Sequence, residues 1–286
     1  MRIEAYISDM MRIDFIKMHG LGNDFVVVDA RAQDPGLDEA AYRAIGDRRR
    51  GVGFDQFLTI LPPVNGGTAF MKIHNPDGSE AEACGNGTRC VAAVLMDETG
   101  KNEAVVETVA GFLICGRSDD GRVTVDMGPA GLNWRDLPLA REVDTLSVAL
   151  EDAPMTGACC VGMGNPHSVF FVDDAETVPL AEIGPVLENH PMFPERANIE
   201  FATVRSPTEI RMRVWERAAG ITQACGSGAC AVLVAAVRRG LAERRADVIL
   251  DGGILTIEWT EEERVLMTGP TATSFEGSLR LPDRGG

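Results

Sequence analysis

The sequence predicts an α+β fold of two similar domains, each mostly β-sheet with one central apolar helix. Three observations predict this class: an internal repeat, an apolar helical segment after each copy of a cysteine motif, and many short strands between turn residues. The chain has 286 residues, which suits about two domains and is long enough to bury a sizeable core.

A cysteine motif occurs twice. Ala-Cys-Gly-Asn-Gly around Cys84 returns as Ala-Cys-Gly-Ser-Gly around Cys225, an offset of 141 residues. A Gly-Pro pair that ends at Pro129 returns at Pro270 with the same offset, and a Gly-Asn pair returns with an offset of 142 residues. These repeats predict a duplicated domain with pseudo-twofold symmetry. The alternative interpretation is two unrelated glycine-rich loops.

The elements are predicted from local patterns in chain order. Strands rich in β-branched or aromatic residues are expected at 25–29, 57–61, 69–73, 104–108, 112–115, 123–126, 168–172, 209–215, 247–250, 254–259 and 265–267. Helices are expected at 38–48, 88–96, 180–188 and 229–238. The second and fourth helices follow the cysteine motifs, and each stops near a glycine, which is common just past a helix end.

The predicted elements divide into two halves. Residues 11–130 are expected to form the N-terminal half and residues 131–271 the C-terminal half, because Gly, Pro and Trp interrupt the pattern at 130–140. Residues 1–10 are expected to be an extension that gives no information about function.

Charge and cysteine usage limit the classes of function. Lys and Arg number 27 against 43 Asp and Glu, a net charge of −16, so binding to nucleic acid or to an anionic membrane surface is not expected. The longest apolar stretch, 229–237, is much shorter than the roughly 20 residues of a spanning helix. No signal peptide is evident, so the expected location is cytoplasmic. Seven cysteines without a Cys-x-x-Cys pair, and four scattered histidines, indicate neither a disulfide framework nor a metal site.

Each repeated cysteine is predicted to lie just before a helix N-terminus. Unpaired N–H groups and the helix dipole favour negative charge there, and they can lower a thiol pKa from about 8.5 to roughly 3.5–7.5. Two related domains could present such cysteines to opposite faces of one carbon, where one thiolate removes a proton and the other thiol returns one. Helix N-termini would stabilise charge on an adjacent carboxylate, and the scheme needs no cofactor. The alternative is that each cysteine is an inert buried side chain.

The motifs resemble those of the diaminopimelate epimerase family. They occur in order from about residue 11 to the C-terminus: Met-His-Gly-Leu-Gly-Asn-Asp-Phe at 18–25, Gly-Val-Gly-Phe-Asp-Gln at 51–56, Asn-Pro-Asp-Gly-Ser-Glu at 75–80, Met-Gly-Asn-Pro-His at 163–167, Pro-Glu-Arg-Ala-Asn at 194–198, Glu-Arg-Ala-Ala-Gly at 216–220, and the two cysteine motifs. The resemblance implies a cofactor-independent epimerase that interconverts LL- and meso-2,6-diaminopimelate in lysine and peptidoglycan precursor synthesis. It also implies two pseudo-symmetric halves, each a mixed, barrel-like sheet wrapped around a central helix. A last strand at about 272–282 would join the first half.

The resemblance also implies roles for individual residues. Cys84 and Cys225 would be the acid/base pair, and His167 and Glu216 would tune their thiols. The substrate would be bound by the side chains of Asn23, Gln56, Asn75, Asn165, Asn198, Glu216 and Arg217 and by the backbone of Gly85, Asn86, Gly226 and Ser227.

A bidentate Arg with amide side chains suits the distal amino-acid end of the ligand. Each of these roles has a structural alternative. Each Asn could be a turn residue, and His167 could be a structural histidine. Glu216 and Arg217 could be an exposed ion pair that contributes little. Ala219 stands where the family usually has Gly, and a positive φ there would be strained.

Parts of the sequence are compatible with other functions. Residues 226–231 fit a Gly-x-Gly-x-x-Ala dinucleotide motif, but no βαβ alternation surrounds them. A related cysteine-pair racemase for another amino acid, such as proline, is the second candidate. A non-enzymatic relative that kept the fold is the third, but such relatives typically lack both cysteines, and this chain has both. The expected partner is a small-molecule substrate, and the sequence leaves a homodimer open.

Overall fold

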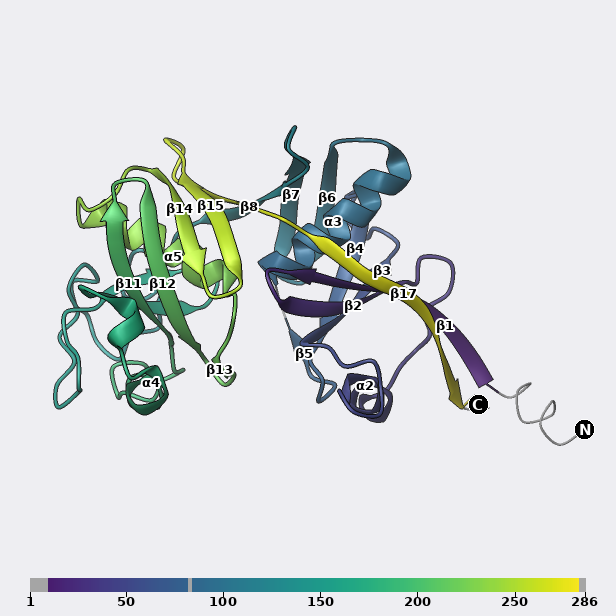
Figure 1. The fold of residues 1–286 in the computed structure, drawn as a ribbon, viewed down its shortest axis with the longest axis horizontal. Helices are drawn as coiled ribbons and strands as arrows, with labels where there is room; N and C mark the ends of the chain where they lie inside the picture. The colour runs from purple at the N-terminus through teal and green to yellow at the C-terminus, as the bar shows by residue number, and fades with distance from the viewer. Residues whose placement is uncertain (1–9, 82–83, 283–286) are drawn as a thin grey trace, which may run out of the picture. The chain divides into compact units, whose positions relative to one another are not determined.

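The computed structural model describes residues 10–81 and 84–282, so most of the expected extension lies outside the described residues. Contacts divide the chain into an N-terminal unit, Met1–Val123 with Thr271–Gly286, and a C-terminal unit, Thr124–Pro270. Figure 1 shows both units as sheets with few helices. This is the α+β class that the sequence predicts.

The N-terminal unit is a mixed sheet. Its strands are β1 (Met10–Gly20), β2 (Asn23–Asp29), β3 (Gln56–Leu61), β4 (Ala69–His74), β5 (Glu80–Ala81), β6 (Glu103–Thr108), β7 (Gly111–Arg117) and β17 (Ala272–Pro282), and its helices are α2 (Glu39–Gly46) and α3 (Gly85–Thr99). The pairs β2–β3 and β4–β6 are parallel, whereas β1–β2, β3–β4 and β6–β7 are antiparallel. The final strand β17 runs antiparallel along β1 (Figure 1).

The C-terminal unit repeats this order. Its strands are β8 (Val123–Pro129), β9 (Cys159–Gly162), β10 (Pro166–Phe171), β11 (Asn198–Ser206), β12 (Glu209–Glu216), β13 (Gly220–Ile221), β14 (Arg245–Leu250), β15 (Gly253–Trp259) and β16 (Arg264–Gly269), and its helices are η1 (Ala175–Thr177), α4 (Leu180–Glu188) and α5 (Gly226–Arg238). The pairs β10–β11 and β12–β14 are parallel, and β9–β10, β11–β12 and β14–β15 are antiparallel. Each step therefore has a counterpart in the N-terminal unit, with α4 in the place of α2 and α5 in the place of α3.

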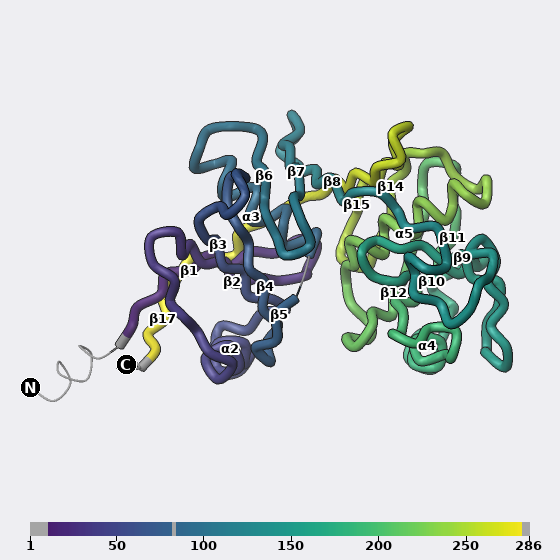
Figure 2. Tube along the Cα trace, turned by 180° about the vertical axis from the view of Figure 1, so that it is seen from behind, coloured from purple at the N-terminus to yellow at the C-terminus, as the bar shows by residue number. Residues whose placement is uncertain are grey.

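The central helix α5 is buried along its length. Every residue from 229 to 236 is fully inaccessible to solvent, and the helix contacts β9–β12 and β14–β16. Figure 2 shows α5 among the strands of its unit. A helix that is apolar on all sides is stable only inside such a sheet, which explains why this segment lacks amphipathic spacing.

The boundary between the units differs from the predicted one. The sequence placed it at 130–140, but β8 pairs with β16 in the C-terminal unit. The hydroxyls of Thr124 and Thr268 are 2.7 Å apart, and Arg264 donates to Asp126 at 2.6 Å. These contacts between strands hold β8 in the C-terminal unit, ahead of the Gly, Pro and Trp residues.

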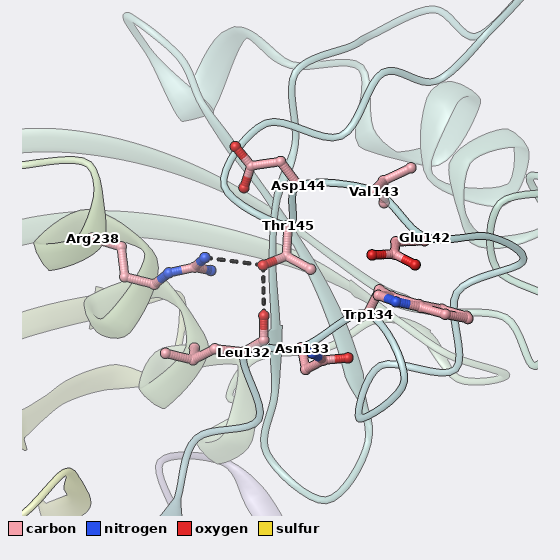
Figure 3. Close-up of a pocket in the computed structure, with 8 residues that line it drawn as sticks. All are labelled: Leu132, Asn133, Trp134, Glu142, Val143, Asp144, Thr145 and Arg238. Carbon is pink, nitrogen blue, oxygen red and sulfur yellow. Dashed lines mark hydrogen bonds between the residues drawn. The ribbon is translucent and has the colours of Figure 1, made fainter.

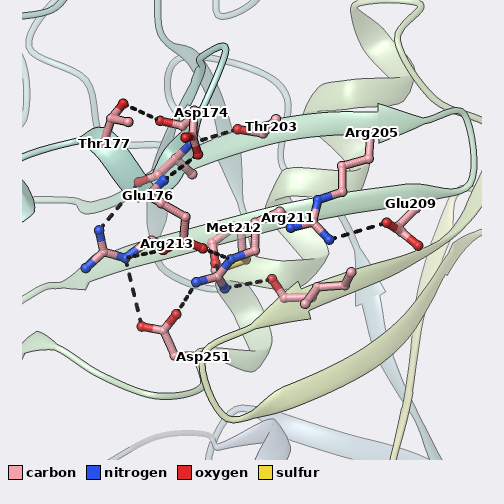
Figure 4. Close-up of polar contacts among 12 residues, drawn as sticks. Asp174, Glu176, Thr177, Thr203, Arg205, Glu209, Arg211, Met212, Arg213 and Asp251 are labelled. Atoms are coloured by element: carbon pink, nitrogen blue, oxygen red, sulfur yellow. Dashed lines mark hydrogen bonds and ion pairs between the residues drawn. The ribbon is translucent and has the colours of Figure 1, made fainter.

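Ion pairs join η1 to β12 and to the turn between β14 and β15. Arg211 on β12 donates to Glu176 at 2.6 Å and also to Asp251 in the β14–β15 turn (Figure 4). Arg213 lies within 4.0 Å of the same two carboxylates. The cluster joins three elements and balances its own charge, so it has a structural role.

Within the described part of the chain, no helix is both long enough and apolar enough to span a bilayer.

Candidate active site

The two repeated cysteines occupy the same position at the start of the two central helices. Cys84 is the N-cap of α3, where its sulfur accepts the Gly87 N–H at 3.3 Å. Cys225 is the N-cap of α5 and accepts the Gly228 N–H at 3.4 Å. The prediction that each cysteine lies just before a helix is confirmed. The first-turn N–H groups beside each sulfur lack partners within the helix, so each unit has a place for an anion.

In the N-terminal unit, Asn23 links Cys84 to a charged network. The Asn23 carbonyl oxygen accepts from the Asn86 amide at 3.1 Å and lies 4.0 Å from the Cys84 sulfur. The Asn23 amide nitrogen donates to Asp55 at 2.9 Å, which fixes the orientation of the amide group. Arg48 in turn donates to Asp55 at 2.6 Å. Sequence reasoning did not assign a role to Asp55 or Arg48, although Asp55 lies inside one of the motifs.

A second acid in this network is strongly ionised. Burial alone would raise the pKa of Asp24, but hydrogen bonds from Arg48 and Lys17 outweigh it and lower the pKa to about 2. Lys17 also donates to the carbonyl of Gly53. The buried Lys17 therefore has two acceptors, and the network is stable only while Asp24 is charged.

Gln56 and Asn75 lie at strand ends of the same unit. Gln56 is the first residue of β3 and pairs with Phe25. Asn75 follows β4 in a turn, where its side chain donates to the Ser79 hydroxyl at 3.0 Å. The turn interpretation of Asn75 thus describes its local structure.

In the C-terminal unit, Cys225 lies beside two carboxylates. Thr222 donates a hydrogen bond to Glu216, and the Cys225 thiol also favours the charged form of that carboxyl. Burial raises the pKa of Glu216, and the hydrogen bonds only partly offset it. Burial, together with the charges of Glu216 and Glu200, also raises the pKa of Cys225 well above its ordinary value.

The expectation of a lowered thiol pKa is therefore wrong for Cys225. The Gly228 N–H does stabilise negative charge on the sulfur, but burial and two neighbouring carboxylates have the larger effect. The helix N-terminus was visible in the sequence, whereas the carboxylate of Glu200 was not connected with it. The surroundings of Cys225 therefore favour the protonated thiol.

His167 lies in a buried hydrogen-bonded chain. Its Nδ1 is 2.6 Å from Glu200 Oε1, and its Nε2 is 2.8 Å from Asn165 Oδ1. The side chains of His167 and Glu200 are both fully inaccessible. Sequence reasoning missed Glu200, because no strand was predicted around it and a lone Glu carries no signal. Only the pairing of β10 with β11 brings it to His167.

The side chain of Asn198 binds the backbone of Arg217. The side-chain oxygen Oδ1 of Asn198 accepts the Arg217 backbone N–H at 2.9 Å, and its Nδ2 donates to the Pro166 backbone carbonyl at 3.1 Å. The buried Asn198 thus holds the start of the loop that carries Arg217. In this loop the positive φ, 65°, falls on Ala218 and not on Ala219, so the predicted strain at Ala219 is absent.

A polar hollow of about 580 Å³ lies elsewhere in the C-terminal unit. It is lined by Leu132, Asn133, Trp134, Glu142, Val143, Asp144, Thr145 and Arg238. Figure 3 shows Arg238 and Thr145 joined by a hydrogen bond of 2.9 Å. Arg238 ends α5 and Cys225 precedes its first turn, so the hollow lies at the other end of the helix from the cysteine.

No group of three or more His, Cys, Asp or Glu side chains within residues 10–81 and 84–282 is arranged to hold a metal ion.

The fold is shared with solved structures of low sequence identity. A phenazine biosynthesis protein of the PhzF family from Bacillus anthracis superposes with a TM-score of 0.68 at 18% identity, over 94% of this chain and 99% of that one. A hydroxyproline epimerase from Agrobacterium vitis superposes with a TM-score of 0.65 at 18% identity, over 96% of this chain and 94% of that one. The chain thus has the duplicated α+β fold that occurs in PhzF proteins and in amino-acid epimerases.

The sequence comparisons identify the family. The diaminopimelate epimerase family profile matches residues 15–132 and 159–273. A protein named diaminopimelate epimerase from Rhodospirillum centenum is 60% identical over 93% of this chain and 91% of its own length. A protein of the same name from Acidiphilium cryptum is 54% identical over 93% of this chain and 95% of its own length. The chain belongs to the diaminopimelate epimerase family.

Proposed function

We propose that this protein interconverts LL- and meso-2,6-diaminopimelate without a cofactor, with Cys84 and Cys225 as paired acid and base. Family membership and the 60% identity to a protein named for this activity support the reaction. The observation that carries the mechanism is the matched placement of the two sulfurs, each capping the central helix of one repeated unit. The mechanism requires both sulfurs to face one substrate carbon.

In this mechanism the α-proton leaves one face of the substrate as the other face gains one. One thiolate takes the proton, the resulting carbanion charge spreads into the substrate carboxylate, and the second thiol delivers its own proton to the opposite face. The first-turn N–H groups at Gly85, Asn86, Gly226 and Ser227 would stabilise that carboxylate. Because Cys225 is held as a thiol, we assign it the proton-donating role in the resting enzyme and assign the base to Cys84.

The remaining predicted residues would bind the substrate. Asn23 is held by Asp55 with its oxygen toward Cys84. Arg217, whose backbone Asn198 anchors, would bind the distal carboxylate through two parallel hydrogen bonds. Gln56, Asn75, Asn165 and Glu216 would complete the contacts, and His167 with Glu216 would tune the thiols.

The test is an epimerisation assay in D₂O. Purified protein given LL-diaminopimelate should form the meso isomer with deuterium at the inverted α-carbon, because the returned proton comes from a solvent-exchanged thiol. Proline and glutamate, offered in parallel, should not be inverted. Product without deuterium would contradict the two-base mechanism, and inversion of proline alone would assign the chain to the alternative racemase activity.

The cellular setting is also proposed. An odd number of cysteines and a reaction that needs reduced thiols suit the cytoplasm. Whether two copies form the homodimer that the sequence leaves open is measured by sedimentation velocity of the same sample.

A further inference from the structure

A buried carboxylate lies at the end of helix α4, against the loop that carries Arg217. Glu188 is the last residue of α4, and only 5% of its surface is exposed. Its Oε2 accepts the indole N–H of Trp215 at 2.7 Å, and its Oε1 accepts the backbone N–H of Ala218 at 2.9 Å. Arg196 also donates to Oε1, at 3.4 Å. An indole N–H, a peptide N–H and a guanidinium can only donate, so Glu188 is the acceptor in all three bonds.

The backbone of the Arg217 loop is held at two successive N–H groups. The Arg217 N–H donates to the side-chain oxygen of Asn198, and the next N–H, that of Ala218, donates to Glu188. Both acceptor residues are buried. Ala218 has a φ of 65°, a left-handed conformation that is unfavourable for an alanine. The bond to Glu188 fixes the direction of this N–H, so it stabilises the strained conformation.

The guanidinium of Arg217 is held by a neighbouring loop that Glu188 also contacts. Arg217 Nη1 donates to the backbone carbonyl of Glu195 at 3.2 Å. Glu195 precedes Arg196, whose side chain is bonded to Glu188. Glu188 therefore binds the two segments that determine where Arg217 lies, its own loop and the loop of Glu195. A guanidinium has five N–H groups, so the bond to Glu195 leaves others for the carboxylate of a ligand.

The equivalent position of the N-terminal unit is a glycine. Helix α2, the counterpart of α4, ends at Gly46, where α4 ends at Glu188. A Cβ built on Gly46 would lie 3.1 Å from the Cβ of Pro76, and the strand register makes Pro76 the counterpart of Arg217. The helix end thus lies close to the same turn in both units. The duplicated fold does not need a carboxylate there, and Glu188 occurs in the unit that carries Arg217.

The stability of α4 does not explain the carboxylate. The C-terminus of a helix carries a partial negative charge, so an acidic side chain is unfavourable there. Burial of a carboxylate costs further free energy unless donors surround it. The donors of Glu188 lie outside α4, on Arg196, Trp215 and Ala218. Glu188 therefore stabilises the loops around Arg217 and not the helix to which it belongs.

We propose that Glu188 is a positioning residue that holds Ala218 in its left-handed conformation and thereby directs Arg217 to the distal carboxylate of the substrate. The inference rests on the proposed function in one respect, because it takes Arg217 as the group that binds this carboxylate. Two parallel hydrogen bonds from a guanidinium need a fixed orientation. Without Glu188, Ala218 can relax to a right-handed or extended conformation, which turns the Arg217 side chain away from that orientation.

The direct test is hydrogen exchange at the Ala218 amide, measured by NMR without substrate. Ala218 is exposed, so its N–H is open to water once the bond to Glu188 is lost. Glu188→Met keeps the length of the side chain and removes both acceptor oxygens, so exchange should become at least about tenfold faster. Glu188→Asp, which withdraws the carboxylate by one methylene, should change exchange in the same direction if Glu188→Met does not fold. Unchanged exchange in the folded variant would overturn the inference.

Kinetics supply the second test. In Glu188→Met, KM for diaminopimelate should rise by about 10-fold or more, with a smaller change in kcat, because the orientation of a binding group is lost while the cysteines stay in place. The matched control is Glu107→Met, which removes a buried carboxylate of the N-terminal unit that accepts from the N–H groups of Val64, Asn65 and Gly67. Its KM should stay at the wild-type value. A rise in KM in both variants, or in neither, would contradict the inference.

A rescue experiment tests the conformation of Ala218 itself. Glycine adopts a positive φ without the steric penalty of alanine, so the loop depends less on Glu188 when Ala218 is replaced by glycine. Adding Ala218→Gly to Glu188→Met should lower the raised KM by about threefold. A double variant with the same KM as Glu188→Met would show that Glu188 does not act through this conformation, and would refute the inference.

The two proposals can fail separately. Hydrogen exchange is measured without turnover, so it decides whether Glu188 holds the loop even if the chain fails to epimerise diaminopimelate. Conversely, an active enzyme whose KM is unchanged in Glu188→Met would refute this inference and leave the proposed function intact.

Discussion

Replacing each cysteine by serine and by alanine separates its capping role from its chemistry. The Cys84 and Cys225 sulfurs accept N–H groups at 3.3 and 3.4 Å, so alanine removes a cap, whereas serine restores one with a better acceptor. We expect each alanine variant to lose about 1 kcal/mol of stability, or roughly 2–4 °C in Tm, and each serine variant to lose less. A serine hydroxyl is too weak an acid to replace a thiol, so both substitutions should lower kcat by at least about 10²-fold.

The assay combines differential scanning calorimetry with ¹H NMR in D₂O, which follows inversion and α-proton exchange together. A variant that keeps one thiol should still exchange the α-proton of one stereoisomer with solvent, because removal and return on the same face need only one base. Inversion should be lost in all four variants. The mechanism is refuted if a serine variant inverts diaminopimelate within about tenfold of the wild-type rate. Equal Tm values for the alanine and serine variants would refute the capping argument.

Two further predictions concern the surroundings of the cysteines. Asp24→Asn should destabilise the protein by about 1–2 kcal/mol at pH 7, somewhat less than the full pKa shift implies because solvent screens the pairs with Lys17 and Arg48. The pKa of Asp24 is about 2 in the folded state, below its unfolded value, so the difference in free energy of unfolding between the wild type and Asp24→Asn should shrink as the pH falls from 4 towards 2. Urea unfolding measures this difference, and a difference that grows in acid would contradict the prediction. Gly228→Ala should abolish most activity, because its Cβ would lie 2.9 Å from a Glu200 oxygen that is hydrogen-bonded to His167. Gly87→Ala should have a smaller effect, because its Cβ would meet the Leu58 methyl groups at 3.0 and 3.2 Å, and these groups can move. Equal kcat values for the two alanine variants would show that the contact with Glu200 has no part in activity.

The central helices and their caps could be predicted from the sequence because their signals are local. A cysteine, two glycines and an apolar run stand next to each other in the chain, and the structure uses them as N-cap, first turn and buried helix around Cys84 and Cys225. Most of the central strands were predicted for the same reason, but β11 was not. The strand β1 was not, because Asp14 and Lys17 interrupt its apolar pattern. Lys17 is tolerated in the buried strand only because Asp24 and the Gly53 carbonyl accept from it.

The supporting groups of the site could not be predicted, because they depend on pairing between distant strands. Nothing in the sequence around Glu200 connects it to His167, 33 positions earlier, until β10 and β11 pair in parallel. The same holds for Asp55, which reaches Asn23 only after β2 pairs with β3. The resemblance to a family supplied the residues proposed to touch the substrate, but the residues that hold them follow from the coordinates.

The two repeats have diverged around their cysteines. The proposed two-base reaction starts with one thiolate and one thiol, and different surroundings shift the pKa values of the two sulfurs by different amounts. The repeats keep the cap, the glycines and the strand order, but Phe25, Leu58 and Asn75 of one unit correspond by register to His167, Glu200 and Glu216 of the other. The carboxylates of Glu200 and Glu216 favour the protonated form of Cys225. Duplication thus provides two sulfurs in matched positions, and substitution around one of them raises the proton affinity of that sulfur.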